Sequence, residues 1–310
     1  MRKTILIICV LLLGSTYALA QINDEESRKW NQPVKPFKVI GNVYYVGATE
    51  VSSFLITTSE GHILLDSGFL ETVPQIQQNV AQLGFRFEDI KILLNSHAHS
   101  DHAGGLARLK ELTGAKLMVS EGDVTQLARG GKDDPNFGDR FLFPPVTVDR
   151  TLRDGDTVKL GDVVLTARLT PGHTKGCTTW TMKVREGAKL YEVAFVGSTT
   201  APGYKLVAND KYPDIVEDYE QTFRLLKNLP VDVYLAAHGS AFGLIEKMKQ
   251  LGQSPRNPFI DPAGFKRMLA RTETQFRAEL KRQQGWCPKL SIFLLSAFLL
   301  VAEHALFRGS

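Results

Sequence analysis

The motif NSHAHSDHAGG, at residues 95–105, holds side chains that can bind a metal ion. His97, His99, Asp101 and His102 fall within six residues, although the whole chain of 310 residues has only seven histidines. Neutral imidazole and carboxylate are preferred zinc ligands where thiolate is absent. A polar surface turn would be this rich in histidine only by accident. The motif therefore predicts a metal site.

The position of the motif along the chain favours convergence of these side chains. The unbroken apolar run IKILL, at residues 90–94, predicts a buried strand that ends just before the motif. Side chains alternate between the two faces of an extended chain, so His97 and His99 share one face. Asp101 and His102 follow after the chain turns, and they can point to a second position nearby.

Two further histidines are candidates to complete the metal site. His173 lies in TPGHTKGCTTW and His238 in YLAAHGSAF, and both follow β-rich runs and enter turns that contain glycine. Loops that leave strand ends on one edge of a sheet are where side chains converge. Of the remaining histidines, His62 is interpreted as an exposed strand residue, and His304 lies in the C-terminal tail.

The alternation of predicted strands and helices indicates one α/β domain. Strands followed by a helix occur twice along the chain, and no linker separates the two halves. Helical periodicity is predicted near residues 73–83, 106–112, 219–226 and 262–280, and residues 129–145 are expected to form a surface loop. We assign residues 21–283 to this domain, built of layered sheets covered by helices.

Composition excludes one class of function. The chain is 43% hydrophobic and 23% charged, which is ordinary for a soluble globular protein. Its formal net charge is +4, and Arg2 and Lys3 at the N-terminus supply two of those charges. No basic stripe interleaved with aromatic residues is present in the sequence, so we expect no nucleic-acid partner.

Both ends of the chain carry apolar segments. Residues 1–20 have the positive start, apolar run and small-residue cleavage site of a signal peptide, which predicts export to the periplasm. Residues 284–310 form an extension with an apolar run at 290–302, too short to span a bilayer. Contact with a membrane, packing on the domain or a partner, and no role at all remain alternatives for it. Cys177 is expected to be free, although a bridge to Cys287 is the alternative.

The motifs NSHAHSDHAGG, TPGHTKGCTTW, VGSTTAPGYKLV and AAHGSAFGL together resemble those of the metallo-β-lactamase superfamily. The chain is similar to the zinc β-lactamases of the third subclass in particular, over residues 30–283. The resemblance implies an αββα sandwich of two mixed sheets flanked by helices, with two zinc ions per chain. The implied ligands are His97, His99 and His173 for the first zinc, and Asp101, His102 and His238 for the second.

Ser198, in VGSTTAPGYKLV, distinguishes branches of this superfamily. Members that resemble glyoxalase II have a metal-bridging aspartate at this strand end, and zinc β-lactamases of the first subclass have a zinc-binding cysteine. Serine is typical of the third subclass, in which a histidine at the position of His102 binds the second metal instead. The implied activity is hydrolysis of the β-lactam amide bond, including that of carbapenems, which would confer antibiotic resistance.

The resemblance also implies roles for single residues. Asp101 would orient a zinc-bound hydroxide that attacks the lactam carbonyl, and Ser198 and Thr200 would contact the substrate carboxylate. Tyr204 and Lys205 are expected to assist them. Asp66 would fix the tautomer of a histidine, or it is an ordinary turn residue at a strand end. From its position alone, the loop at residues 129–145 is expected to line or cover the groove.

Two other functions are compatible with the same motif. The chain could be another dizinc hydrolase, a lactonase or a thioesterase, because the fold family hosts several reactions. It could also be a catalytically idle zinc-binding module whose apolar tail docks a partner. The absence of an aspartate at position 198 argues against the first alternative, and the complete set of six candidate ligands argues against the second.

Overall fold

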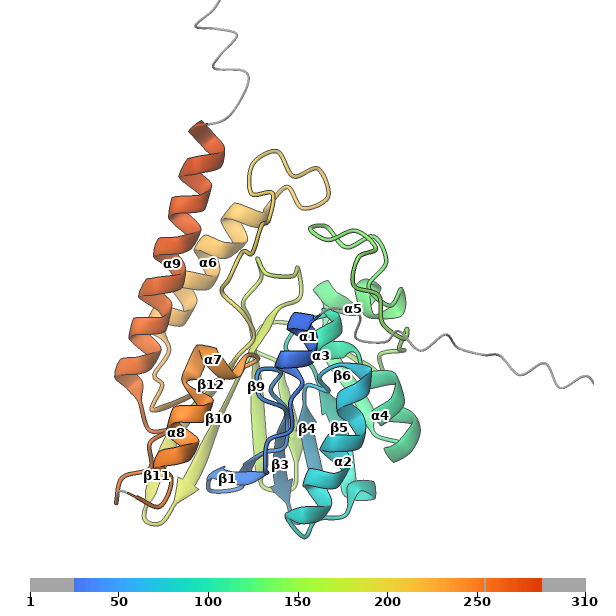
Figure 1. The fold of residues 1–310 in the computed structure, drawn as a ribbon, viewed down its shortest axis with the longest axis vertical. Helices are drawn as coiled ribbons and strands as arrows, with labels where there is room; N and C mark the ends of the chain where they lie inside the picture. Colours follow the sequence, from blue (N-terminus) through green and yellow to red (C-terminus); the bar gives the residue numbers. More distant parts are fainter. Residues whose placement is uncertain (1–24, 254, 286–310) are drawn as a thin grey trace, which may run out of the picture.

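Two β-sheets stacked face to face form the centre of the molecule (Figure 1). The computed structural model describes residues 25–253 and 255–285. The first sheet has seven strands, in the spatial order β1 (Phe37–Ile40), β2 (Val43–Tyr45), β3 (Phe54–Thr58), β4 (Gly61–Leu65), β5 (Ile90–Leu94), β6 (Lys116–Ser120) and β7 (Arg150–Leu152). The strands β1 to β4 pair antiparallel, and β4 to β7 pair parallel.

The second sheet has five strands, in the order β12 (Val233–Ala236), β11 (Lys189–Val196), β10 (Thr178–Glu186), β9 (Val163–Leu169) and β8 (Thr157–Leu160). Only β11 and β12 pair in parallel, and the other neighbours are antiparallel. Parallel neighbours need a crossover connection, which here includes the helix α6 (Ile215–Asn228). Both sheets are therefore mixed, which confirms the fold expected from the sequence.

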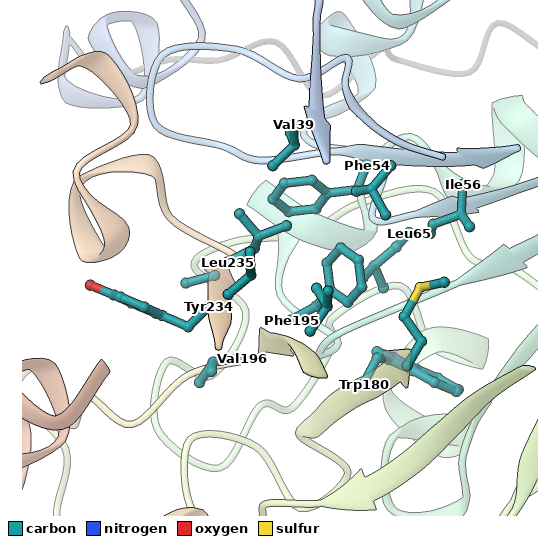
Figure 2. Close-up of a cluster of buried hydrophobic side chains, with 14 of the residues drawn as sticks. Val39, Phe54, Ile56, Leu65, Trp180, Phe195, Val196, Tyr234 and Leu235 are labelled. Carbon is teal, nitrogen blue, oxygen red and sulfur yellow. The ribbon is translucent and has the colours of Figure 1, made fainter. Parts of the chain in front are cut away.

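Apolar side chains from both sheets fill the space between them (Figure 2). In β3, Phe54 and Ile56 point to the second sheet, where they belong to the same buried cluster as Trp180 and Phe195. Leu55, between them, points to the opposite face and packs in a separate cluster with helices. Because side chains alternate along a strand, the apolar run of a central strand supplies two cores at once.

Helices cover the outer face of each sheet, as Figure 1 shows. Over the first sheet lie α2 (Val73–Gln82), α4 (Leu106–Thr113) and α5 (Glu121–Ala128). Over the second sheet lie α6, α8 (Leu244–Gln250) and α9 (Pro262–Gly285). Three shorter helices, α1 (Glu25–Trp30), α3 (Ser100–Ala103) and α7 (Gly239–Phe242), lie near the loops described below.

Local signals in the sequence set several helix ends. The α9 helix begins as expected after Asp261, whose Oδ1 accepts a hydrogen bond from the backbone N–H of Gly264 at 2.8 Å. Gly114 ends α4 in the left-handed conformation, with a φ of 68°. The domain boundary expected at residue 283 falls in the last turn of α9, which continues to Gly285.

His62 corrects one expectation. Its side chain is only 8% exposed, although the sequence pattern suggested an exposed position on the strand. The strand β4 lies between β3 and β5, so helices and loops cover its outer face as well. The ring of His62 packs edge-on against Phe85, with 5.1 Å between ring centroids.

The expected signal peptide, Cys287 and the apolar run at 290–302 lie outside the described residues. Within the described part of the chain, no helix is both long and apolar enough to cross a membrane.

Phe54→Ala should destabilise the sandwich, because the Phe54 ring lies between the sheets and contacts the rings of Tyr45, Phe195 and Phe242. We expect a loss of about 3–5 kcal/mol in the free energy of unfolding, measured by urea denaturation. Leu190→Ala is the control, because this side chain is 52% exposed and should change stability by less than about 0.5 kcal/mol. Equal effects of the two substitutions would contradict the proposed core.

Candidate metal centre

The histidine and aspartate side chains expected to bind metal lie on loops and on the short helix α3, at one end of the sandwich. The loop that carries His97 leaves the carboxyl end of β5, and the loop with His238 leaves the carboxyl end of β12. His173 lies in the connection between β9 and β10. Ligand sites form outside the carboxyl ends of parallel strands, since loops from neighbouring strands meet there.

The structure brings His97, His99 and His173 together. Their candidate ligand atoms all lie within 4.8 Å of one another. His99 Nδ1 is 3.2 Å from His173 Nε2, and the ring of His97 lies edge-on to both of the other rings. Nitrogen lone pairs at this spacing can share one metal ion, because zinc–nitrogen bonds are about 2.0–2.1 Å long.

Asp101, His102 and His238 form a second group beside the first. Asp101 Oδ2 is 3.1 Å from His102 Nε2 and 3.4 Å from His238 Nε2, and the two histidine nitrogens are 3.2 Å apart. The rings of His97 and His102 have centroids 4.2 Å apart, so the two groups are adjacent. The donor set is therefore suited to binding metal, and its assignment to two zinc ions stays a prediction.

Each of the five histidines has a polar atom next to the ring nitrogen that points away from the shared centre. The pairs are His97 Nδ1 with Ser96 Oγ (3.0 Å), His173 Nδ1 with Thr200 O (2.8 Å), His99 Nε2 with Asp134 Oδ2 (3.5 Å), His102 Nδ1 with Asp66 Oδ2 (3.9 Å) and His238 Nδ1 with Glu50 Oε1 (3.6 Å). At His173 the acceptor lies within hydrogen-bond distance, so it holds the proton on Nδ1 and leaves Nε2 for a metal. The carboxylates beside His99, His102 and His238 lie 3.5–3.9 Å away, beyond a hydrogen bond, and favour the same arrangement by charge alone.

Electrostatics favours the protonation states that metal binding needs at His97, His173, His238 and Asp101. Burial and the positive charges of neighbouring histidines hold the pKa of His97 and of His173 well below the usual range. Burial, and after it His102, lowers the pKa of His238 to about 4. Burial alone would raise the pKa of Asp101, but the adjacent His102 holds that pKa well below its usual range. At neutral pH these side chains are neutral imidazoles and an ionised carboxylate, the forms that bind metal.

Asp66 links the ends of β4 and β5. Its Oδ1 accepts hydrogen bonds from the backbone N–H of Ser96 at 2.6 Å and from Asn95 Nδ2 at 2.9 Å, while Oδ2 faces His102. Asp66 has a φ of 61°, a left-handed conformation that is strained for a residue other than glycine. Burial raises its pKa to about 6. Asp66 thus anchors the turn that leads into the histidine motif, and its expected role in fixing a histidine stays a prediction.

Asp123 is a buried residue at this site that the sequence did not single out. Its Oδ2 accepts hydrogen bonds from the backbone N–H of Ala98 and from Thr174 Oγ1, both at 2.9 Å. Its Oδ1 accepts from the backbone N–H of Gly176, also at 2.9 Å. Ala98 lies between two candidate ligands and Thr174 follows a third, so one carboxylate ties both loops together. No local pattern in EGDVTQ distinguishes this aspartate from a residue of an ordinary first helical turn.

A cavity of about 550 Å³ opens beside the two groups of ligands. Its wall includes His99, Asp101, His173 and His238, together with Ser198 and Thr200, two of the expected substrate contacts. Phe137, Arg140 and Phe141 from the loop at residues 129–145 line the same cavity, as expected for that loop. Trp30, Met268 and Arg271 close other sides, from α1 and α9. The cavity is therefore largely apolar, with a few hydroxyl and charged groups near the candidate metal centre.

Two expected substrate contacts and one thiol lie elsewhere. Tyr204 is 1% exposed and packs behind His173, with its hydroxyl oxygen 3.3 Å from His173 Nδ1. Lys205 is exposed on the following loop, and neither residue lines the cavity. Alternation along this extended segment turns Tyr204 inward and Lys205 outward, and their expected assistance to substrate binding stays a prediction. Cys177 is free, as expected, and fully buried, and burial raises its pKa to about 12.

Known proteins of similar sequence and structure place this fold and site in context. A family model described as the metallo-beta-lactamase superfamily matches residues 46–238. The solved structure of the FEZ-1 metallo-beta-lactamase from Legionella gormanii is 44% identical, covers 82% of this chain and 98% of its own, and has a TM-score of 0.81. The subclass B3 metallo-beta-lactamase BJP-1 of Bradyrhizobium japonicum is 39% identical, with 83% and 98% covered and a TM-score of 0.80.

Curated relatives found by sequence are more distant and carry other activities. A hydroxyacylglutathione hydrolase of Hyphomonas neptunium is 30% identical over 106 residues, which cover 34% of this chain and 34% of that protein. A protein of Burkholderia pseudomallei, described as a probable metallo-hydrolase, is 34% identical over 127 residues, or 40% of this chain and 42% of its own length. The acyl-coenzyme A thioesterase MBLAC2 of Gallus gallus is 24% identical over 245 residues, covering 72% and 82%. This chain spans less than half the length of the first two.

Asp123→Ala should loosen the candidate metal centre, because it leaves three buried donors without an acceptor. We expect the free energy of unfolding of the chelator-treated protein to fall by on the order of 3–5 kcal/mol, measured by urea denaturation. Asp123→Asn should cost less, since one amide oxygen can still accept from Ala98 and Thr174. If both variants were as stable as the unmodified protein, Asp123 would not hold the two loops together.

Proposed function

Because the chain belongs to the metallo-beta-lactamase superfamily, we propose that it is a zinc-dependent β-lactamase that hydrolyses the amide bond of β-lactam antibiotics, carbapenems among them. One observation carries this proposal. Solved structures described as metallo-beta-lactamases are 35–44% identical to this chain and cover more than 80% of it. Ser198 at the end of β11, where a bridging aspartate would be expected in a glyoxalase-like member, supports the same activity.

We assign two zinc ions to the site, the first to the group of three histidines and the second to the group with Asp101. When bound, the ions would polarise the lactam carbonyl and make a water molecule more acidic. Asp101 lines the cavity and is ionised, so its carboxylate can also accept a hydrogen bond from the attacking water and orient it. Asp101 thus has a role in catalysis as well as in metal binding.

The substrate carboxylate needs a cation and hydrogen-bond donors in the cavity. The hydroxyl groups of Ser198 and Thr200 lie 3.2 Å apart on its wall. On α9, Met268 and Thr272 contact the intervening Thr199, and Arg271 lines the cavity beside them. Among the described residues the guanidinium group of Arg271 forms no ion pair, so its charge is free for an anionic substrate. We assign to Arg271 the role first expected of Lys205.

We also propose that the protein is exported to the periplasm. A β-lactamase protects a cell when it meets the antibiotic before the antibiotic reaches its target, and the predicted signal peptide at residues 1–20 would deliver this chain to the periplasm. The protein would then contribute to antibiotic resistance. Residues 1–24 lie outside the described structure, so the support for this location is the sequence pattern alone.

Thioester hydrolysis is the second candidate. It is favoured by the curated relatives, which include hydroxyacylglutathione hydrolases and an acyl-coenzyme A thioesterase that aligns with 72% of this chain. The same ligand groups could serve both reactions, since the chemistry of attack on an acyl carbon is shared. The lower identity, 24% for the thioesterase against 44% for the FEZ-1 structure, makes this the weaker candidate.

Purified protein loaded with zinc should open the ring of a carbapenem and of a chromogenic cephalosporin, and EDTA should abolish that activity. Loss of the β-lactam absorbance measures the reaction. An acyl-coenzyme A thioester, S-lactoylglutathione and a lactone, assayed in parallel, test the alternatives. Turnover of a thioester or lactone but of no β-lactam would reject the proposal, and turnover of none with metal bound would indicate an idle zinc-binding module.

Arg271→Gln should raise KM for a β-lactam about tenfold and change kcat little, because a charge-assisted hydrogen bond to the substrate carboxylate is lost. Steady-state kinetics with a carbapenem measures both constants. Arg267→Gln is the matched control, since it removes the same charge from the same helix at an exposed position that pairs with Asp261. An unchanged KM in Arg271→Gln would show that the carboxylate binds elsewhere.

A further inference from the structure

Glu50 lies on the wall of the cavity, behind His238. Its carboxylate is fixed by α7: Oε2 accepts a hydrogen bond from the backbone N–H of Ser240 at 3.0 Å, and Oε1 accepts one from Ser240 Oγ. The same Oε1 is 3.6 Å from His238 Nδ1, an ion-pair distance slightly longer than a hydrogen bond. On the other side of the ring, Nε2 faces Asp101 and His102. Glu50 therefore contacts the imidazole from the side opposite the candidate metal.

Backbone pairing holds Glu50 in this position. The backbone carbonyl of Glu50 accepts a hydrogen bond from the N–H of Gly239 at 2.8 Å, and its N–H donates to the carbonyl of Trp30 at 2.9 Å. Val51 forms an isolated β-bridge with His238 itself. The ring of Trp30 packs edge-on against the ring of His238, with 5.4 Å between centroids. The turn before β3 and the helix α1 are thus tied to the strand end that carries the ligand.

Differences in burial show why His238 needs such support. The side chain of His102 is fully buried and that of His99 is 11% exposed, so packing limits where their rings can turn. The side chain of His238 is 27% exposed, the most open of these three rings. An imidazole offers either nitrogen to a metal, and the nitrogen next to a carboxylate keeps the proton. For His238, burial does not fix the ring, and the Glu50 carboxylate is the group placed to do so.

From these contacts we infer that Glu50 is a positioning residue for His238 and sets the affinity of the second zinc site without binding the ion. The inference rests on the proposed two-zinc centre. Glu50 holds the proton on Nδ1, so that the lone pair of Nε2 points to the space shared with Asp101 and His102. The group of three histidines has no contact with Glu50 among the described residues, so the first site should not depend on it.

Zinc titration of Glu50→Ala against a competing chelator, with metal content measured after dialysis, tests the inference. The second zinc should bind ten- to a hundredfold more weakly and the first as before. Glu50→Gln should fall between, because its amide oxygen can still accept the Nδ1 proton. Asp134→Ala is the matched comparison, because Asp134 is the carboxylate beside His99 and its removal should weaken the first site instead.

A double-mutant cycle separates positioning from a general structural role. If Glu50 acts through His238, adding Glu50→Ala to His238→Ala should not weaken zinc binding further. Additive losses, or a lower melting temperature of the zinc-free Glu50→Ala protein together with loss of both ions, would overturn the inference. The inference would also be overturned if Glu50→Ala bound two zinc ions as tightly as the unmodified protein. The same holds if the unmodified protein bound only one zinc ion. Because the readout is zinc binding, a failure of β-lactam hydrolysis would reject the proposed function and leave this result intact.

Discussion

Five imidazole rings can share so small a space only if most of them are neutral. Positive charges at these separations would repel one another strongly, and burial adds a penalty for any charge that lacks a partner. The low pKa of His97, His173 and His238 follows directly from this constraint. His102 is the exception, because Asp101 beside it stabilises the protonated ring and raises its pKa against the effect of burial. Most of the rings are therefore already in the neutral form that binds metal, and only His102 would have to release a proton first.

The β-sandwich holds these histidine rings in place. Its two sheets share one apolar core, and that core fixes where the strands end and therefore where each loop begins. Trp180 shows how closely the core and the centre are connected, because its buried indole N–H donates to the carbonyl of Asn95, two residues before His97. Outside the core, carboxylates such as Asp66 and Asp123 hold the loops by accepting backbone N–H groups. Because these loops are held in place, the nitrogen lone pairs of the histidines can point to a common centre.

The residues that line the cavity determine which ligands can reach the candidate metal centre. Its lining includes hydroxyl groups from the end of β11, a cation from α9, and aromatic rings from the loop at residues 129–145 and from α1. Such a lining suits a partly apolar ligand that also bears a polar or anionic group. Solved structures with up to 44% identity share the fold over most of the chain, whereas curated relatives with thioesterase activity share less. These comparisons therefore show the superfamily and its metal-binding character, and the β-lactam substrate is our proposal.

The sequence by itself determined the features that depend on neighbours along the chain. The motif at residues 95–105 predicts ligands because its spacing is local, helix ends follow from Asp261 and Gly114, and the resemblance in four motifs predicts the fold. Only the tertiary structure decided which side chains support those ligands. Glu50 and Ser240 are 190 residues apart in the sequence, and Asp123 is 53 residues from Gly176. No local pattern marks such partners, because their role arises from packing two sheets together, and the same packing turned Tyr204 away from the cavity and brought Arg271 to it.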